Sequence, residues 1–277
     1  MTAQTHRLDV DGVQVGVREY GEPGAGPSVV FLPAMGVPLR YYEPLFEAWP
    51  RHVIGVEWRG QPESRVADLR RARFGYSDLL RVDLPAVVAL AADRGAPQVV
   101  LVGHSLGGQI ALLAAASGTV RPAAVVTVAT GTSSPTHLPL VLRWQRRLGV
   151  SVVRTITWAA GHWPGDRFRF AGRQPRTLIR DWAYEARHGR YRFAGDPTDY
   201  EAALAGSRVP ALLIDLAGDR MIPAGAVDHL AARVGGPVER ASLSQRAGFD
   251  HFSWARRTPR VVIDRIETWL GAPAGPR

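Results

Sequence analysis

Short apolar runs alternate with longer segments of helical spacing along most of the chain. Residues 6–21 alternate apolar and polar positions around a central Asp-Gly and predict a β-hairpin. Later runs are apolar at consecutive positions, as in parallel strands covered by helices on both faces. These runs lie at 28–33, 52–58, 98–104, 123–130 and 210–219, followed by a strand-like segment at 237–245. Helical patterns fall between or after them, at 39–49, 78–94, 106–117, 224–234 and 259–270. This order predicts an α/β fold with a mostly parallel central sheet flanked by helices.

Residues 131–208 interrupt this alternation. They hold no convincing strand–helix repeat, and their helical pieces are broken by proline and glycine. The strand pattern restarts only at 210–219. We therefore expect a core formed by residues 1–130 and 209–277, with residues 131–208 inserted as a largely helical cap.

Length and composition exclude several classes of protein. The 277 residues fit one large domain with an insertion. No apolar run approaches the roughly 20 residues that span a bilayer. The N-terminus passes directly into strand-like sequence without an apolar signal segment, so a cytoplasmic protein without a membrane span is expected. Cysteine is absent, which excludes disulfides, zinc–thiolate sites and thiol nucleophiles. Nothing in the sequence predicts an oligomeric state.

The chain is basic, with a net charge of +9, and all 34 of its basic residues are arginine. Lysine and asparagine, which use adenine-rich codons, are absent, so a GC-rich genome explains the choice of arginine. No nucleic-acid-binding motif accompanies the charge, and no nucleic-acid partner is expected. The excess gathers in residues 131–208, which hold thirteen arginines and six acidic residues. A basic cap would attract an anionic acyl substrate, such as acyl-CoA, an acyl-carrier protein or a carboxylated ester; a solvated basic surface without a partner is the alternative.

The segment GHSLGG, residues 103–108, joins an apolar strand to an apolar helix and fits the Gly-x-Ser-x-Gly pattern. So tight a turn strains the backbone of the serine and leaves no room for side chains at 103 and 107. Ser105 would then stand clear of the sheet at a helix N-terminus, where backbone N–H groups favour a developing anion. The alternative is a glycine-lined helix start with an N-cap serine. The strand before and the apolar helix after the motif favour a nucleophile.

A serine nucleophile needs a base, and the base needs an acid to orient it. Asp219 ends the strand-like run at 210–219, and His251 follows the last predicted strand, which is the expected order Ser, acid, His. Asp215 lies inside its strand and is better placed to face a neighbouring strand or helix. Asp250 is better explained as a solvated loop residue. We therefore predict Ser105, Asp219 and His251 as the catalytic residues.

Candidate oxyanion-hole and pocket residues follow from the same geometry. The backbone N–H of Leu106 is one expected donor, and that of Met35, in the loop after the strand at 28–33, is the other. His104 is a pocket candidate beside the serine, although its ring should point away from the nucleophile. The other pocket candidates are the cap residues Trp163 and Trp182, with Trp144, Trp158, Phe168 and Phe170 in the same category. These aromatic residues would line an acyl pocket or form the cap's own core.

With these motifs in place, the chain resembles the α/β-hydrolase superfamily over essentially its whole length. It is most similar to a bacterial branch of predicted serine hydrolases that carries segments like MGVPLRYYEPLFEAW and GHWPGDRF. The resemblance implies the α/β-hydrolase fold, hydrolysis through an acyl-enzyme, and no metal or organic cofactor. Two departures stand out. The segment EWRGQPES, residues 57–64, has Glu57 and Pro62 where Asp and Gly are usual, and Pro33-Ala34 replaces His-Gly. We expect both to alter the walls near the active site.

The function expected is a serine hydrolase that cleaves a carboxylic ester or thioester of a small acyl substrate. Asp at the position of Ser105 would instead suggest dehalogenase or epoxide hydrolase chemistry. A serine acyl-enzyme that passes its acyl group to an alcohol, an amine or peroxide would make the protein an acyltransferase or perhydrolase. A non-catalytic receptor or scaffold of the same fold would have no need of all three residues. The substrate panel that distinguishes these functions must therefore include acyl acceptors.

Overall fold

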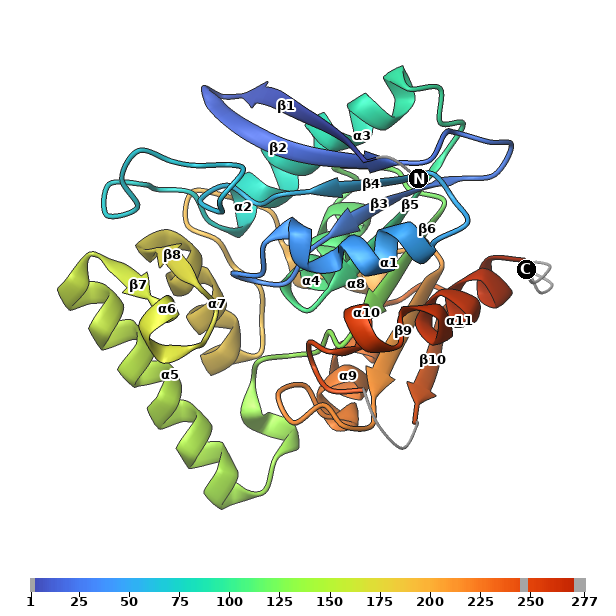
Figure 1. The fold of residues 1–277 in the computed structure, drawn as a ribbon. Helices are drawn as coiled ribbons and strands as arrows, with labels where there is room; N and C mark the ends of the chain where they lie inside the picture. Colours follow the sequence, from blue (N-terminus) through green and yellow to red (C-terminus); the bar gives the residue numbers. More distant parts are fainter. Residues whose placement is uncertain (1–2, 245–248, 272–277) are drawn as a thin grey trace.

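The computed structural model describes residues 3–244 and 249–271 (Figure 1). Within these ranges the central sheet has eight strands, in the order β1-β2-β4-β3-β5-β6-β9-β10. The strands are β1 Gln4–Val10, β2 Val13–Tyr20, β3 Ser28–Leu32, β4 Val53–Val56, β5 Val99–His104, β6 Ala124–Val128, β9 Ala211–Leu216 and β10 Val238–Leu243. β1 and β2 form an antiparallel hairpin, β2 also pairs antiparallel with β4, and every other pair in this sheet is parallel.

Helices cover both faces of the sheet, because its inner strands are buried on both sides. Val30 and Leu32 of β3 belong to a hydrophobic core shared with α3 and α4, whereas Val29 and Phe31 face the other core, shared with α1 and α11. The flanking elements are η1 Leu39–Tyr42, α1 Glu43–Ala48, α2 Tyr76–Asp78, the π-helical turn η2 Leu79–Asp83, α3 Leu84–Asp93, α4 Leu106–Ala116, α8 Tyr200–Gly206, α9 Ala224–Ala231, α10 Trp254–Arg257 and α11 Pro259–Gly271. Consecutive strand residues therefore contribute to opposite helical layers.

The predicted α/β fold with a mostly parallel sheet is confirmed, and each predicted strand and core helix is present within a few residues of its predicted ends. Gln245, the last residue of the predicted strand 237–245, lies outside the described residues. One helix differs in form. The helix predicted at 78–94 contains the π-helical turn η2 ahead of Pro85, because a proline has no N–H to offer the carbonyl group one turn earlier.

Residues 131–208 connect β6 to β9 and include the short helix η3 Pro135–His137. A long helix, α5 Leu140–Ala160, packs against α7 Arg176–His188. Between them lie α6 Gly165–Phe168 and the small antiparallel pair β7 His162–Pro164 and β8 Arg173–Pro175. The insertion was predicted to consist of broken helical pieces, yet α5 runs 21 residues through Gly149 and ends at Gly161. The last helix of the segment, α8, packs on α4 of the core.

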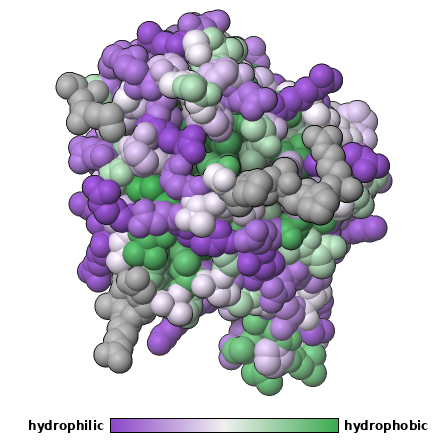
Figure 2. Space-filling view, turned by 90° about the vertical axis from the view of Figure 1, so that its right-hand side faces the viewer, coloured by the Kyte–Doolittle hydropathy of each residue, from purple (hydrophilic) through white to green (hydrophobic). Residues whose placement is uncertain are grey.

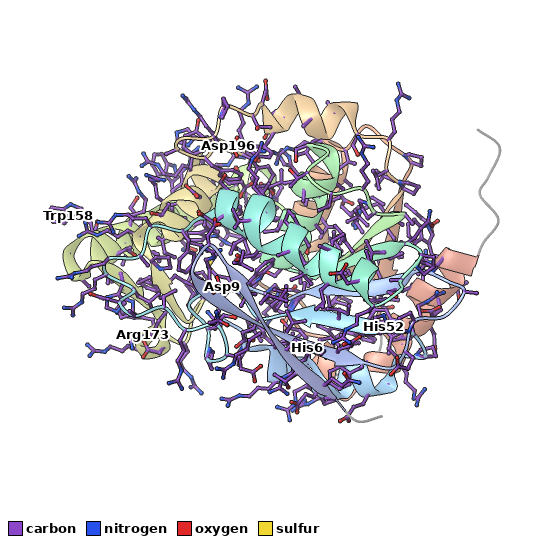
Figure 3. All side chains as sticks on the ribbon, turned by 90° about the horizontal axis from the view of Figure 1, so that it is seen from above. His6, Asp9, His52, Trp158, Arg173 and Asp196 are labelled. Carbon is purple, nitrogen blue, oxygen red and sulfur yellow. The ribbon has the colours of Figure 1, made fainter. Side chains whose placement is uncertain are left out.

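The segment containing α5, α6 and α7 extends from one side of the sheet (Figure 1). The surface is mostly hydrophilic in Figure 2, but hydrophobic atoms gather at the lowest point of the molecule, where α5 begins in Figure 1. Seen from above in Figure 3, Trp158 points outward at the far edge of this segment, away from His52 on the side of the sheet. Among the described residues, no helix combines the length and the apolar character needed to cross a bilayer.

Candidate active site

Ser105 occupies the turn between β5 and α4 in a conformation that is rare for residues with a side chain. Its φ of 53° and ψ of −115° are strained for any residue other than glycine. The two neighbouring glycines make the turn possible. A Cβ atom on Gly107 would lie 2.0 Å from the carbonyl oxygen of Leu32, and one on Gly103 would lie 2.3 Å from the amide nitrogen of Gly108. The strained turn holds the Ser105 hydroxyl at the N-terminus of α4.

The structure brings Ser105, His251 and Asp219 together from three separate elements. Nε2 of His251 lies 3.2 Å from Oγ of Ser105, and Nδ1 of the same ring lies 2.7 Å from Oδ2 of Asp219. Oδ1 of Asp219 accepts the backbone N–H groups of Met221 and Ile222 at 2.8 and 2.9 Å. Both oxygens of the carboxylate therefore have donors, and its orientation toward the imidazole is fixed by the loop after β9.

The two rejected acids lie elsewhere. Oδ1 of Asp215, inside β9, accepts hydrogen bonds from Arg240 at 2.8 Å and from the Ser242 hydroxyl at 2.9 Å, both on the neighbouring strand β10. Asp250 is exposed, and its Oδ1 accepts the backbone N–H groups of Phe252 and Ser253. Neither carboxylate is hydrogen-bonded to the ring of His251, as expected from their positions in the sequence.

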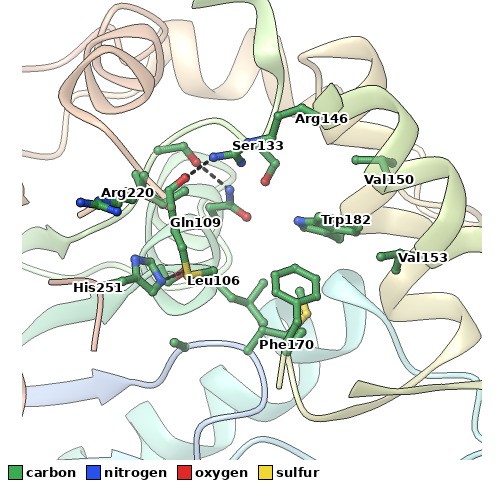
Figure 4. Close-up of a pocket in the computed structure, with 18 of the residues that line it drawn as sticks. Leu106, Gln109, Ser133, Arg146, Val150, Val153, Phe170, Trp182, Arg220 and His251 are labelled. Carbon is green, nitrogen blue, oxygen red and sulfur yellow. Dashed lines mark hydrogen bonds between the residues drawn. The ribbon is translucent and has the colours of Figure 1, made fainter. Parts of the chain in front are cut away.

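A cavity of about 590 Å³ opens beside Ser105 and His251. Core residues line one side and the inserted segment lines the other. Figure 4 shows His251 and Leu106 facing Trp182, Val150 and Val153 across it. Most of the remaining lining is apolar, from Ala34, Met35, Gly131, Gly149, Phe170, Ala171, Met221, Ile222 and Phe252. The hydrogen-bonded side chains of Ser105 and His251 thus face a mainly hydrophobic space.

The two expected oxyanion donors, Met35 and Leu106, both line this cavity. Two hydrogen bonds with buried aromatic side chains hold the loop that carries Met35. The N–H of Ala34 donates to the phenol oxygen of Tyr42 at 3.1 Å, and the indole N–H of Trp58 donates to the carbonyl oxygen of Pro33 at 2.9 Å. These bonds fix the backbone immediately before Met35.

The segment 57–64 does not line the cavity, so the expectation that its departures change the cavity walls is wrong. The carboxylate of Glu57 is buried and accepts the backbone N–H of Leu39. Burial raises the pKa of Glu57 to about 7. The segment therefore acts on the site through the loop between β3 and η1, by holding Leu39 with Glu57 and Pro33 with Trp58.

Of the predicted pocket residues, Trp182 and Phe170 line the cavity, whereas His104, Trp163, Trp144, Trp158 and Phe168 do not. His104 is fully buried on the opposite side of the elbow, where Nδ1 lies 2.7 Å from the Tyr42 hydroxyl. Trp163 is buried within the segment 131–208, stacked on Phe168 with ring centroids 5.0 Å apart. The chain alternates sides at the elbow, which carries His104 away from Ser105, and Trp163 belongs to the β7–β8 pair rather than to α5 or α7.

Two hydrogen-bonded polar residues that line the cavity, Tyr76 and Gln109, were not predicted from the sequence. The Tyr76 hydroxyl donates to Oε1 of Gln109 at 2.9 Å, and Nε2 of Gln109 donates to the carbonyl oxygen of Gly131 at 2.8 Å. Burial raises the pKa of Tyr76 well above its ordinary value, so its hydroxyl stays protonated as a donor. Gln109 follows Ser105 by four residues, and this spacing on a helix was the signal that could have found it.

Arg146 and Arg220 also line the cavity. Nothing in the sequence distinguished these two from the other arginines. Arg146 of α5 is half-buried, and its guanidinium donates to the carbonyl oxygen of Met221 at 2.6 Å (Figure 4). The pKa of Arg146 is lower than its ordinary value, because burial lowers it by more than the charge of Asp219 raises it. Arg220 is exposed at the cavity edge. Arg143 and Arg147, close to Arg146 in sequence, do not line the cavity.

Two buried acids of α7 hold this helix in place: Asp181 bonds to the core, and Glu185 bonds to the beginning of the inserted segment itself. Oδ2 of Asp181 accepts the backbone N–H of Tyr76, and Glu185 accepts the Thr132 hydroxyl and the backbone N–H of Ser133. Burial raises the pKa of Asp181 to about 6 and raises that of Glu185. Because Tyr76 and Ser133 both line the cavity, these bonds hold α7 and the cavity wall in one arrangement. Among the described residues, no group of three or more His, Asp or Glu side chains is placed to hold a metal ion.

Comparison with known proteins assigns the fold to a family. A model of the alpha/beta hydrolase family matches residues 29–265. The chain belongs to the alpha/beta hydrolase family. No curated protein matches the sequence.

Several solved structures of this family share the fold at low sequence identity. A bacterial membrane phospholipase A superposes with a TM-score of 0.67 at 17% identity, covering 97% of this chain and 86% of its own. An enol-lactonase from Burkholderia xenovorans has a TM-score of 0.62 at 19% identity over 96% and 100% of the two chains. A haloalkane dehalogenase from Bradyrhizobium elkani has a TM-score of 0.64 at 17% identity over 97% and 98%. These likenesses extend over nearly the whole chain and concern the fold.

Proposed function

We propose that this protein is a serine hydrolase that cleaves a carboxylic ester or thioester through an acyl-enzyme intermediate. The observation that carries the proposal is the continuous contact from Ser105 Oγ to His251 Nε2 at 3.2 Å and from His251 Nδ1 to Asp219 at 2.7 Å, beside an apolar cavity. Serine at the elbow favours acyl transfer over dehalogenation, which requires a carboxylate nucleophile there.

The chemistry follows from these contacts. His251 Nε2 takes the proton of the Ser105 hydroxyl as Oγ attacks the acyl carbon, and a tetrahedral oxyanion forms. The intermediate collapses when His251 gives that proton to the leaving oxygen or sulfur, which departs as an alcohol or thiol. A water molecule then repeats the sequence on the acyl-enzyme, and the carboxylic acid leaves. Asp219 keeps its charge throughout, holding Nδ1–H in place and stabilising the imidazolium.

The backbone N–H groups of Met35 and Leu106 are the proposed donors to the oxyanion. Both residues line the cavity, and Leu106 is the first residue of α4, where backbone N–H groups have no partner within the helix. The loop of Met35 is already fixed through Ala34 and Pro33. Donors held in position before the reaction are the main electrostatic contribution in acyl transfer.

The charge of the cavity favours a substrate with an anionic group. Arg146 lines the cavity on α5 beside Gln145 and Val150, and no acidic side chain among the described residues forms an ion pair with it. Arg220 adds a second guanidinium at the edge. A carboxylate or phosphate on the acyl or leaving group would satisfy the free N–H groups of Arg146. We therefore propose an anionic acyl substrate, the class to which carboxylated esters, acyl-CoA and acyl-carrier protein belong.

The test is a substrate panel on the wild type and Ser105→Ala. It comprises p-nitrophenyl esters of graded chain length, acyl-thioesters, lactones and a haloalkane, each with and without added alcohol. We expect turnover of esters or thioesters, labelling by a fluorophosphonate, and loss of both in Ser105→Ala by at least about 10⁴-fold in kcat. Turnover that persists in Ser105→Ala, or turnover of the haloalkane alone, contradicts the proposal. Ester products that replace the acid when alcohol is present would identify an acyltransferase.

A further inference from the structure

The outward face of α5 is apolar. Val141, Trp144, Leu148 and Val152 follow one another at spacings of three and four residues, which places them on one side of a helix. All are exposed, Trp144 to 62% and Leu148 to 66%. Trp158, near the end of the same helix, is 72% exposed and points away from the molecule in Figure 3. We call Val141, Trp144, Leu148, Val152 and Trp158 the α5 stripe.

The α5 stripe is not the side through which α5 packs on the rest of the protein. α5 packs on α7 and β7 through its opposite side, where Val150 and Thr157 are buried. Val150 joins Ala183, Ala186 and Trp182 in a small separate core. Figure 2 shows hydrophobic atoms gathered at the tip of the molecule where α5 begins. An exposed apolar patch of this extent marks a surface for binding rather than for folding.

A basic groove of about 340 Å³ lies beside the α5 stripe. Trp144, Arg147, Ser151, Arg187 and His188 line it, so it lies between α5 and α7. The Arg147 guanidinium lies over the Trp144 ring, 5.7 Å from its centroid. Neither Arg147 nor Arg187 forms an ion pair within the described ranges, whose ion pairs involve other arginines. The Ser151 hydroxyl donates to the carbonyl oxygen of Arg147, and Nδ1 of His188 lies 2.9 Å from the carbonyl oxygen of Tyr184. The two guanidinium groups, which form no ion pair with the described residues, are the donors in this groove that suit a phosphate group.

We propose that the α5 stripe and this groove form a peripheral binding site for a bilayer that contains anionic phospholipids. The apolar side chains would enter the boundary between headgroups and acyl chains, where tryptophan is favoured. Arg147 and Arg187 would bind a lipid phosphate in the groove at the level of the headgroups. The protein would lie on the surface of such a membrane through the outward side of α5.

Charge favours this occupant over a second copy of the chain. A symmetric dimer through the α5 stripe would bring Arg147 close to the basic residues of the other copy, and like charges across an interface are unfavourable. An anionic bilayer presents the complementary charge and an apolar interior together. The phosphates of a nucleic acid would bind the arginines of the groove, but the α5 stripe would remain exposed to water.

The site is distinct from the proposed catalytic machinery. Arg146, Val150 and Val153 of α5 face the cavity, whereas the stripe and the groove face outward. One helix therefore has a cavity side and a membrane side. Substitutions on the outward side should leave turnover of a small water-soluble ester unchanged, which separates this proposal from the proposed function.

The experiment is co-sedimentation of the full protein with vesicles of phosphatidylcholine alone or mixed with phosphatidylglycerol, at 0.1 M and 0.5 M salt. The stripe variant carries Leu148→Ser and Val152→Ser, and the groove variant carries Arg147→Gln and Arg187→Gln. The matched control carries Arg208→Gln and Arg260→Gln, which remove the same charge from exposed positions outside the inserted helices. Circular dichroism and turnover of a soluble ester check that each variant is folded.

The wild type should bind the anionic vesicles, with weaker binding at 0.5 M salt and on neutral vesicles. The stripe variant should lose at least about tenfold in partition coefficient, because each buried side chain contributes about that factor. The groove variant should lose about fivefold per arginine on anionic vesicles only, and the control should bind nearly as the wild type does. Absence of vesicle binding, equal binding to both vesicle types, or an equal loss in the control overturns the proposal. A wild-type dimer in light scattering that becomes monomeric in the stripe variant overturns it in favour of a second copy.

Discussion

The phenol oxygen of Tyr42 lies 2.7 Å from Nδ1 of His104 and accepts the N–H of Ala34 at 3.1 Å. Since the backbone N–H must donate, the phenol hydrogen remains available for Nδ1. Burial lowers the pKa of His104 well below its ordinary value, so the ring stays neutral and accepts that hydrogen. One hydroxyl thus connects the end of β5, next to Ser105, with the loop that carries Met35.

Tyr42→Phe should therefore lower kcat more than it affects KM. It removes the hydroxyl that holds Ala34, and the neighbouring Met35 N–H then loses its fixed position. We expect kcat to fall about tenfold, with a stability loss of about 1–3 kcal/mol from the two buried groups left unpaired. Steady-state kinetics and urea denaturation measure the two effects.

Tyr200→Phe is the control for this change, because it also removes the hydroxyl of a buried tyrosine, one that donates to Asp196 at 2.6 Å; neither residue lines the cavity. It should cost stability without lowering kcat. If both variants lose kcat equally, Tyr42 has only a general structural role.

Asp219→Asn should lower kcat by about 10³–10⁴-fold, because the amide no longer favours the productive tautomer of His251. Asp215→Asn is the matched change four residues earlier, inside β9, whereas Asp219 lies in the loop after that strand. It breaks a bond to Arg240, and should change stability by about 1 kcal/mol and kcat by less than about twofold. Steady-state kinetics of both variants on one activated ester measure the two changes in kcat. A harmless Asp219→Asn together with a severe Asp215→Asn would show that the acid is misassigned.

Arg146→Gln should distinguish anionic from neutral substrates. The amide can still donate to the Met221 carbonyl, but it no longer carries a charge. We expect kcat/KM for a carboxylated ester to fall about tenfold or more, while that for its methyl-capped analogue changes little. Arg147→Gln, on the outward side of the same helix, should leave both values unchanged. An equal loss for both substrates in Arg146→Gln would assign Arg146 a structural role.

Glu57 should make the protein less stable as pH rises. Its folded pKa of about 7 exceeds the ordinary value of 4.5, so between these pH values the folded state holds a proton that the unfolded state has lost. The free energy of unfolding then falls with pH by about 3 kcal/mol through this window and is level above it.

Urea denaturation from pH 4.5 to 8 measures this effect as the difference between wild type and Glu57→Gln. The difference should shift in favour of the variant as pH rises. Glu22→Gln, at an exposed position, should show no such trend. A wild-type stability that rises relative to Glu57→Gln over this range would reverse the assigned sign.

Much of the core was determined by local sequence. Apolar strands separated by helical segments are sufficient for a parallel sheet, because each pattern is fixed by the period of its own element. The turn at Ser105 was also indicated locally, by the Gly-x-Ser-x-Gly pattern between a strand and a helix. The close approach of Gly107 to Leu32, which leaves no room for a side chain, came only from the structure. The positions of Asp219 and His251 at the ends of elements followed from strand order. Their hydrogen-bonding distances came only from the structure.

The tertiary structure decided what each side of α5 faces. Periodicity shows that Trp144 and Leu148 share one side and that Arg146 and Val150 lie on another, but it does not say which side is buried. By hydrophobicity alone, the stripe with Trp144 should face inward. Instead α7 packs on the less apolar side of α5, and Asp181 of α7 is attached to the core at Tyr76. The sequence determined which residues of α5 lie on the same side of the helix. The packing of α5 on α7 decided which of these sides lines the cavity beside Ser105 and which is exposed.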